Sequence, residues 1–506
     1  MKSGAQSRPP RAWRSSRSTH RPTWRDSITS ATWPTRASTR TRAGLTRSCT
    51  GKSSGRCAPT RGSAPCPRPT PGTGACSRRR ASPGSPPRWT CPPRWATTPT
   101  IQSGGCSFTI NAPAFLFLAL YQVTGEKQGV PAAQLRPIVQ NDILKEFFAR
   151  GACVFPVEPS LRLVADTFEY CASVMPRANP ISVCGYHIRE SGATAVQEMA
   201  FAISNAIEYI ERALARGIPI DAFAPRISWN LGAFMNFFEE VAKYRASRRI
   251  WARLMRETYG AQDPRSWRFL WFAGTCGSTF SHRQPLNNIV RATVETMALV
   301  LGGLQSLTVN TWQEAYEIPD QEAMLTALRT QQVVAYESGV ADTADPLAGS
   351  YFVESLTDEY ERRILALMAE VKERGGMARG IESGWVQQQV LEEAYRHSMA
   401  VESGERLIVG ENIFQSADEP PPIRLYQHDP AVLEEQVRRL REVRARRDGA
   451  AVGRALDALR SAARRPDQNL MPATVECVRA YCTIGEIMGV LRDEFGTFQE
   501  PLDIFG

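Results

Sequence analysis

Short apolar runs alternate with amphipathic helical segments from about residue 106 onward. Runs of apolar and β-branched residues predict strands at 106–112, 137–142, 181–187, 226–232, 269–275 and 304–310. Residues 194–216 and 235–258 place apolar side chains at i, i+3, i+4 and i+7 with charges opposite, which predicts helices. Repeated strand-then-helix units indicate parallel strands joined by crossover helices.

A further strand near 351–354, and one expected before residue 104, would bring the strands to the eight of a (β/α)8 TIM barrel. The predicted fold class is therefore α/β, with the barrel over 104–400. A doubly wound sheet would require a Gly-rich phosphate loop after an early strand, and neither GxGxxG nor GxxxxGK[ST] occurs. The prolines of 417–430 (ADEPPPIRLYQHDP) indicate a linker, and 431–463 and 471–495 predict helices of a C-terminal extension over 401–506.

Charge divides the chain unevenly. Residues 1–100 hold 18 Arg and 2 Lys against one acid, Asp26, whereas the rest carries 41 basic and 50 acidic side chains. Because the net charge of +10 comes from one end, it gives no reason to expect a nucleic-acid partner for the remainder. No apolar run reaches the length of a membrane span. Scattered cysteines without a CxxC pair are typical of a cytoplasmic protein.

Residues 1–103 lack any pattern that could bury a core. The first hundred contain one Ile, one Leu and no Val, Phe, Tyr or Glu, but five Trp and five Cys. Out-of-frame translation of a GC-rich gene gives this composition, and reading residues 88–102 two bases further on allows LDMPPTMGYDSDHP, preceded by GLSTA. We interpret 1–103 as out-of-frame or disordered; a basic tail that binds nucleic acid or membrane is the other interpretation.

Polar residues lie where the predicted strands end, which in a barrel is the active-site face. They are Gln140, Tyr186, His187, Asn230 and Gln305, and Arg150 follows a strand–helix turn in KEFFARGACVFP. Each alone could be a hydrogen-bonded structural residue, but their convergence predicts a binding site. The absence of a nucleophile–base pair, a carboxylate dyad and metal-ligand spacing disfavours ordinary hydrolysis.

Several long motifs follow one another along the chain: TINAPAFLFLALY, QNDILKEFFARG, FPVEPSLRL, GYHIRESGAT, AFAPRISW, NNIVRATVETMALVLGG, ESGVADTADPLAGSYFVESLT and GGMARGI. In this order they resemble the large subunit of methylmalonyl-CoA mutase and related B12-dependent acyl-CoA mutases, and the resemblance covers about 104–500. The shifted peptide GLSTALDMPPTMGYDSDHP resembles the family's first barrel strand and its substrate-contacting tyrosine loop. We therefore expect that the first strand is lost to a frame error and that the chain as translated is inactive.

The resemblance also implies roles for individual residues. His187 would donate a hydrogen bond to the thioester carbonyl of the substrate, and Tyr186 would press against the adenosyl group of adenosylcobalamin. Glu190 and Glu354 match acidic residues near the adenosyl ribose. Gln140 and Gln305 match glutamines that line the substrate and corrin sides.

Arg150 matches the family arginine that pairs with a free carboxylate of the substrate, where a planar guanidinium gives a bidentate grip. Similar mutases for isobutyryl-CoA or 2-hydroxyisobutyryl-CoA carry glutamine there. The resemblance thus implies radical interconversion of methylmalonyl-CoA and succinyl-CoA, with a substrate of the isobutyryl-, 2-hydroxyisobutyryl- or ethylmalonyl-CoA type as the alternative. The family's RTHTQTSG reads FLWFAGTCGS at 269–278. This departure leaves open a damaged, non-catalytic barrel that acts only through protein contacts.

The cobalt ligand is expected from a partner. The family's cobalamin-binding module carries DxHxxG, and none of the five histidines has that context: His20, His187, His282, His397 and His428. The resemblance therefore implies adenosylcobalamin as cofactor, a small cobalamin-binding subunit as partner, and a dimeric or heterotetrameric assembly. It implies no metal ligand within this chain.

Overall fold

The computed structural model describes residues 105–417, 422–423, 426–427 and 429–501 of the 506-residue chain. The interpretation of 1–103 as an out-of-frame segment, and with it the lost first strand, lies outside the described residues. The strands are β1 (Ser107–Phe108), β2 (Ile138–Val139), β3 (Ser182–Cys184), β4 (Ser228–Ala233), β5 (Trp271–Thr275) and β6 (Ser306–Thr308). Each overlaps one of the six segments predicted from the sequence, and β4 runs one residue past the end of its predicted segment, 226–232.

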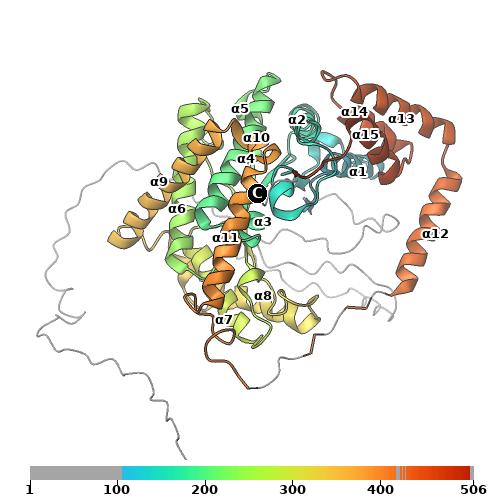
Figure 1. Cartoon of the computed structure of the whole chain (residues 1–506). Coiled ribbons are helices and arrows are strands. Elements are labelled where there is room, and N and C mark those ends of the chain that lie inside the picture. Colours follow the sequence, from blue (N-terminus) through green and yellow to red (C-terminus); the bar gives the residue numbers. More distant parts are fainter. Residues whose placement is uncertain (1–104, 418–421, 424–425, 428, 502–506) are drawn as a thin grey trace, which may run out of the picture. The chain divides into compact units, whose positions relative to one another are not determined.

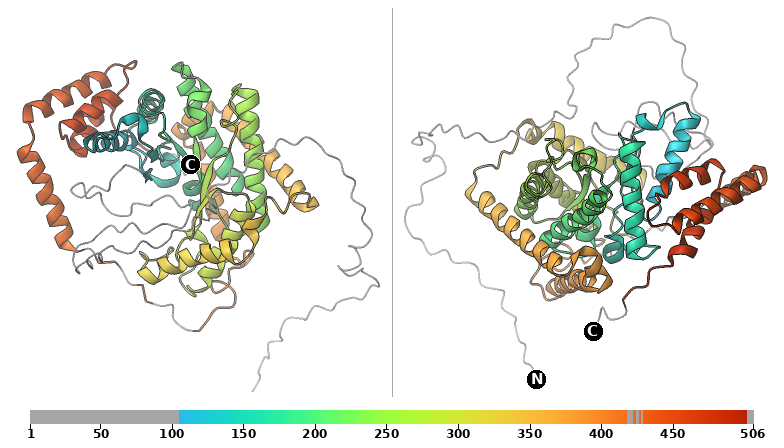
Figure 2. Two further views of the ribbon diagram at one scale, coloured as in Figure 1. Left: turned by 180° about the vertical axis from the view of Figure 1, so that it is seen from behind. Right: turned by 90° about the horizontal axis from the view of Figure 1, so that it is seen from above.

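Within the described ranges, every strand pairing is parallel. β1 pairs with β2, and β3, β4, β5 and β6 form a four-stranded sheet in chain order. A parallel bridge from Ile138 to Asn179 connects β2 to the segment that leads into β3. The fold is therefore α/β with parallel sheets, as predicted, and Figures 1 and 2 show the helices that accompany the strands.

Helices account for most of the other described residues. They are α1 (Ala114–Lys127), α2 (Val157–Ser173), α3 (Gly185–Glu190), α4 (Ala195–Ala215), α5 (Ile220–Phe223), α6 (Phe237–Arg253), α7 (Asn287–Leu301), α8 (Gln321–Tyr336), α9 (Tyr351–Glu373), α10 (Gly376–Glu382), α11 (Trp385–Glu402), α12 (Pro430–Arg446), α13 (Gly449–Ala463), α14 (Met471–Arg479) and α15 (Ile484–Phe495). Two π-helical turns are η3 (Glu146–Arg150) and η5 (Leu254–Thr258). The helices predicted at 194–216 and 235–258 are confirmed, and Thr194 starts α4 with a capping box.

The strand predicted near 351–354 is wrong, because these residues form the first turn of α9. Val353, Tyr360 and Ile364 are buried at helical spacing, whereas Tyr351 is 95% exposed. The apolar run YFV looks like a strand in isolation, but the period of the following residues is 3.6 and decides the outcome. α9 lies along α6 and α4, as Figures 1 and 2 both show.

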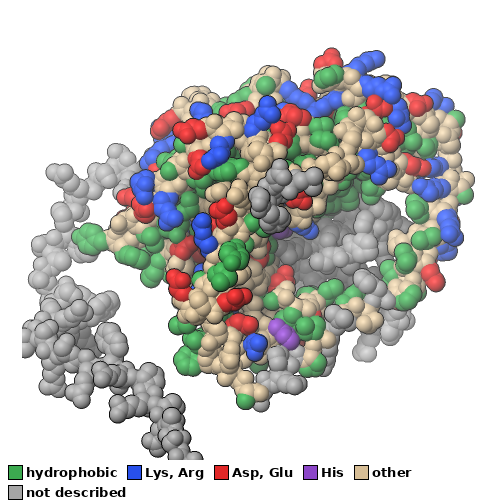
Figure 3. Space-filling model, viewed as in Figure 1, with side chains coloured by type: hydrophobic (Ala, Val, Ile, Leu, Met, Phe, Trp, Pro, Cys, Tyr) green, Lys and Arg blue, Asp and Glu red, His purple; other side chains and the backbone are tan. Residues whose placement is uncertain are grey.

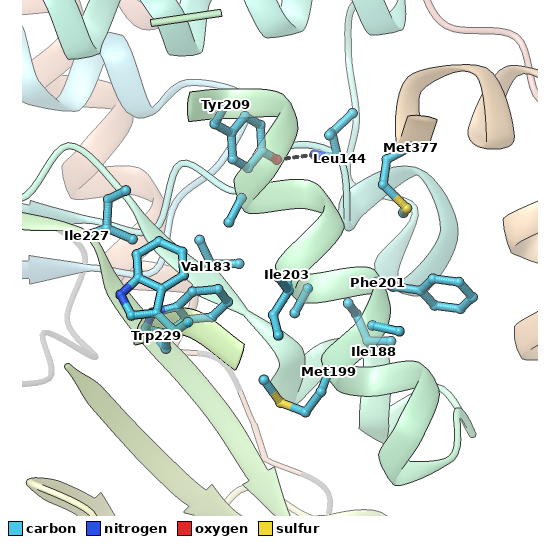
Figure 4. Close-up of a cluster of buried hydrophobic side chains, with 14 of the residues drawn as sticks. Leu144, Val183, Ile188, Met199, Phe201, Ile203, Tyr209, Ile227, Trp229 and Met377 are labelled. Carbon is cyan, nitrogen blue, oxygen red and sulfur yellow. Dashed lines mark hydrogen bonds between the residues drawn. The ribbon is translucent and has the colours of Figure 1, made fainter. Parts of the chain in front are cut away.

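The main core lies between the four-stranded sheet and its helices. Figure 4 shows Val183 of β3 and Trp229 of β4 packed towards Ile203 and Met199 of α4, all fully buried. Burying side chains of this size stabilises the fold by about 1.5–3 kcal/mol each. This packing fixes α4 against β3 and β4 of the sheet.

A second core joins α1, α2 and β1 to the C-terminal helices α13, α14 and α15. Arg162 of α2 donates to the carbonyls of Ala462 and Ala463 at 3.0 and 2.7 Å, at the C-terminal end of α13. A cation at this end of a helix satisfies unpaired carbonyls and the helix dipole. The two helical stretches predicted at 431–463 and 471–495 are confirmed, each as a pair of helices.

Charged side chains of both signs occur on the described part of the surface that Figure 3 shows. On the face in Figure 3, acidic, basic and hydrophobic side chains are interspersed over the helices. Helix α12, in the charged stretch 431–447, has no buried residue and carries ion pairs of Arg438 with Glu435 and Glu442. None of the helices described is long and apolar enough to span a membrane.

Candidate active site

The turn after β2 is buried and held from several sides. Asn141 has a left-handed backbone (φ 51°), and its side-chain amide donates to the carbonyl of Pro180 at 2.9 Å. The carboxylate of Asp142 accepts from the backbone N–H of Cys184 and from the hydroxyl of Tyr209, both at 2.6 Å. Burial raises the pKa of Asp142 to about 6, although both donors oppose this shift. These contacts fix the end of β2 against β3 and α4.

A buried ion pair follows this turn. Lys145 and Glu146 are both fully buried, and their side chains contact each other. The amide of Asn111 donates to Glu146 Oε1 and to Gln140 Oε1, the latter at 3.0 Å. Among the described residues, Glu146 Oε2 has no hydrogen-bond partner. We call these four side chains the Glu146 cluster. Because burying a charge costs several kcal/mol, an adjacent buried pair indicates a position with a specific task.

Arg150 and His187 both border the Glu146 cluster. Arg150 Nη1 lies 3.9 Å from Glu146 Oε1, and the arginine side chain is 48% exposed. His187 Nδ1 lies 2.9 Å from Lys145 Nζ. The structure therefore brings together three residues that the sequence singled out, two at the border and Gln140 inside the cluster.

The sequence predicted a strand over 181–187, but His187 and Tyr186 do not lie on a strand. β3 ends at Cys184, and both residues belong to α3, which Gly185 begins. A Cβ at Gly185 would come within 2.9 Å of side chains from α4 and β4, so α3 packs closely on both elements. Fully buried Ile188 anchors the helix. Tyr186 and His187 thus lie on α3, a short helix at the C-terminal end of β3.

Tyr186 lies at the C-terminal ends of β4, β5 and β6. Its hydroxyl accepts a hydrogen bond from Asn310 Nδ2 at 3.0 Å. A Cβ added at Gly232 or Gly274 would stand 3.5 or 3.3 Å from the tyrosine ring, so these glycines make room for it. Burial raises the pKa of Tyr186 well above its usual value, and the side chain is a neutral phenol. Its ring meets that of His187 edge-on, with centroids 5.6 Å apart.

Glu190 and Glu354, which the resemblance places near the adenosyl ribose, lie in two different parts of the fold. Glu190, at the end of α3, accepts from the backbone N–H groups of residues 277 and 278 at 2.7 and 3.0 Å. Glu354, in the first turn of α9, pairs instead with Arg245 at 2.7 Å and Arg249 at 3.3 Å. Hydrogen bonds from Gly349 and the pairing arginines hold the pKa of Glu354 below its usual value. Only Glu190 therefore shares an element with Tyr186.

Gln305 lies at the wrong end of the sheet for its predicted position. It precedes β6, and its side-chain oxygen accepts from the backbone N–H of Trp271, the first residue of β5, at 2.8 Å. Because β5 and β6 are parallel, this is their N-terminal end, whereas Tyr186 lies at the opposite end. The expectation that Gln305 ends a strand is wrong, because Gln305 stands near the start of the apolar run at 304–310 and directly before Ser306, the first residue of the ladder.

A buried ionic network supports α3, and sequence reasoning did not predict it. Lys243 Nζ lies 2.6 Å from Glu198 Oε2, contacts Glu240 and donates to the carbonyl of Gly232 at 2.8 Å. Arg189 of α3 lies 3.5 Å from Glu240. The attraction of both carboxylates raises the pKa of Lys243 against the opposing effect of burial. This network joins α3, α4, β4 and α6.

Sequence reasoning also missed Lys145 and Asn111. A signal was present in QNDILKEF, where the charged pair at 145–146 is flanked by Leu144 and Phe147, both buried. Charged residues seldom enter such a run unless they are paired. Asn111 carried a weaker signal: it lies one residue before the end of the strand predicted at 106–112, and strand ends form the active-site face of a barrel.

Known proteins match this chain over most of its length. The family model described as methylmalonyl-CoA mutase matches residues 100–497. The chain is 43% identical over 394 residues to the 2-hydroxyisobutanoyl-CoA mutase large subunit of Aquincola tertiaricarbonis, covering 78% of this chain and 70% of that protein. It is 42% identical over 404 residues to the methylmalonyl-CoA mutase of Rhizobium meliloti (strain 1021), covering 79% and 57%.

The mitochondrial methylmalonyl-CoA mutase of Bos taurus is 40% identical over 396 residues, covering 78% of this chain and 53% of the relative. The chain therefore spans little more than half the length of the methylmalonyl-CoA mutases that it matches. A match of this extent, together with the long shared motifs, shows that the chain belongs to the methylmalonyl-CoA mutase family, whose mutases are isomerases.

Proposed function

We propose that this chain is the substrate-binding large subunit of an adenosylcobalamin-dependent acyl-CoA mutase that interconverts methylmalonyl-CoA and succinyl-CoA. The six parallel strands in chain order fit six consecutive strands of a (β/α)8 barrel. The name of the first relative, a large subunit, supports a separate small subunit, which would supply the cobalt ligand. Assembly with that subunit into a dimer or heterotetramer is part of the proposal.

One observation carries the proposal: Arg150 and His187, from different elements, border the same buried cluster. A half-exposed guanidinium can grip a carboxylate with two hydrogen bonds, and an imidazole can donate to a thioester carbonyl. Methylmalonyl-CoA and succinyl-CoA each carry both groups. A substrate with only the thioester would leave Arg150 unused.

The residues at the C-terminal strand ends fit the cofactor in part. Asn230, which the sequence placed at a strand end, lies in the middle of β4, and Thr311 lies shortly after β6. Asn230 Oδ1 and Thr311 Oγ1 are buried and have no hydrogen-bond partner among the described residues, as expected beside a polar ligand. Tyr186 and Glu190 would hold adenosylcobalamin at this end. Gln305 does not fit the same face, because it lies at the N-terminal end of β6.

Adenosylcobalamin, when bound, supplies the radical that starts the rearrangement. Arg150 would hold the free carboxylate of the substrate, which fixes the position of the carbon skeleton. His187 would stabilise negative charge that develops on the thioester oxygen as the carbonyl-CoA group migrates. Tyr186 would shield the reacting carbon atoms from water with its neutral ring.

A second substrate class is supported by the relatives themselves. Identity to the 2-hydroxyisobutanoyl-CoA mutase large subunit is 43% and to a methylmalonyl-CoA mutase 42%, so overall identity does not separate the two. Arg150 is the residue that favours the dicarboxylic substrate. The choice between the classes therefore depends on one side chain and can be tested by changing it.

The test compares Arg150→Gln with Arg177→Gln, an exposed arginine on another turn, in a chain whose first segment is restored to the shifted frame. Charge-assisted hydrogen bonds contribute about 1.5–3 kcal/mol, so kcat/KM for methylmalonyl-CoA should fall by about 10- to 150-fold in Arg150→Gln. Turnover of isobutyryl-CoA should not fall with it. Equal losses for both substrates, or the same loss in Arg177→Gln, would contradict the assignment.

A further inference from the structure

We infer that Lys145 is a positioning residue, whose ammonium group fixes the proton of the His187 ring on Nε2. The meaning of that proton for catalysis rests on the proposed function, in which His187 donates to the thioester carbonyl. The position of the proton itself does not, because it follows from the groups around Nδ1.

The first of these groups is Lys145. Its Nζ lies 2.9 Å from His187 Nδ1, and its side chain is fully buried. It forms an ion pair with Glu146, in which a lysine is an ammonium with three donors and no acceptor. The nitrogen of His187 that faces it must therefore accept the hydrogen bond, and it cannot carry a proton of its own.

The second group is the thiol of Cys184, whose Sγ lies 3.4 Å from the same Nδ1. Burial raises the pKa of this thiol to about 12, so it keeps its proton at neutral pH and can act as a weak donor. Nδ1 thus faces two protonated groups. A neutral ring in this setting carries its proton on Nε2, and a doubly protonated ring would place a hydrogen against an ammonium.

The buried pair next to this histidine has a clear physical purpose on this account. Glu146 contacts the Lys145 ammonium, and the Asn111 amide in turn donates to Glu146. The lysine is thereby held in one orientation away from water. The ion pair costs desolvation free energy but gives a histidine of defined tautomer, because the partner of one ring nitrogen decides which nitrogen carries the proton.

The test is ¹⁵N NMR of the full chain labelled at histidine, which has only five such residues. Protonated and unprotonated ring nitrogens resonate in separate regions, and His187→Gln assigns the signals of residue 187. At pH 7.5 we expect an unprotonated Nδ1 and a protonated Nε2. A protonated Nδ1, or protons on both nitrogens, would overturn the inference.

Lys145→Met should lose this pattern, and Lys145→Arg should retain it because a guanidinium also only donates. Lys372→Met, which removes an exposed lysine of α9, should leave the pattern unchanged. In the mutase assay, Lys145→Met should lower kcat by about 10- to 100-fold with little change in KM, the range for loss of a supporting partner. If the wild-type ring carries its proton on Nε2 but the enzyme shows no mutase turnover, only the proposed function is refuted. If the enzyme turns over but the proton is on Nδ1, only this inference is refuted.

Discussion

Replacing Lys243 by Met should destabilise the fold strongly, because it leaves two carboxylates in the interior with too little positive charge. Lys243 is fully buried and contacts both Glu198 and Glu240, which are also fully buried. After its loss, the nearest cation is Arg189, 3.9 Å from Glu198 and 3.5 Å from Glu240. Removing one partner of a buried ion pair costs about 3–5 kcal/mol, and we expect a loss in that range at pH 8.

The loss should depend on pH. Burial raises the pKa of Glu198, and the attraction of Lys243 opposes this effect, so the substitution should raise that pKa further. A carboxyl whose pKa is higher in the folded than in the unfolded chain binds extra protons when folded, above the unfolded pKa. The stability of the variant should therefore fall as the pH rises from about 5 to 8 more steeply than that of the wild type.

Urea unfolding followed by tryptophan fluorescence at pH 5.5 and pH 8 measures both effects. Lys372→Met, an exposed lysine on α9, is the matched control and should change stability by no more than about 0.5 kcal/mol. Adding Glu240→Gln to Lys243→Met removes one of the unpaired carboxylates and should recover part of the loss at pH 8. A loss below about 1 kcal/mol, or one that is the same at both pH values, would refute the reasoning.

Two further predictions concern the site itself. His187→Ala should lower turnover by about 10²–10³-fold with an unchanged urea midpoint, the scale for loss of one oxyanion donor; an unchanged rate in the mutase assay would make His187 a structural residue. Asp142, with a folded pKa of about 6 against an ordinary value of 3.8, makes stability fall by about 3 kcal/mol as the pH rises from about 3 to 7. Asp142→Asn should flatten this slope in urea unfolding, and a slope that survives the substitution would locate its cause elsewhere.

The periodicity of the sequence was enough to predict the order of strands and helices, because buried strands and amphipathic helices have different apolar periods. It failed where a short apolar run belonged to a longer helix, as at Tyr351. It also placed Tyr186 and His187 on a strand, although β3 stops at Cys184 and packing against α4 selects a helix. Backbone hydrogen bonds decide where a strand or helix ends, and the apolar pattern does not predict them.

The candidate site was predictable only in part. Arg150 and His187 could be named from motifs, but their connection runs through Glu146, whose burial depends on contacts between distant segments. The position of Gln305 depends on which residue of its run first joins the ladder of β5, a register that composition does not define. The roles of these residues stay predictions until the reaction is measured.

The most direct test of the central claim is the reaction of the chain with defined acyl-CoA esters. The chain, with its first segment restored to the shifted frame, would be mixed with adenosylcobalamin and the DxHxxG-containing small subunit encoded nearest its gene. Separate reactions would receive (R)-methylmalonyl-CoA, isobutyryl-CoA and 2-hydroxyisobutyryl-CoA, with products identified by mass spectrometry. We expect succinyl-CoA to form fastest. Faster conversion of either monocarboxylic substrate, or equal activity in the unrestored chain, would contradict the account.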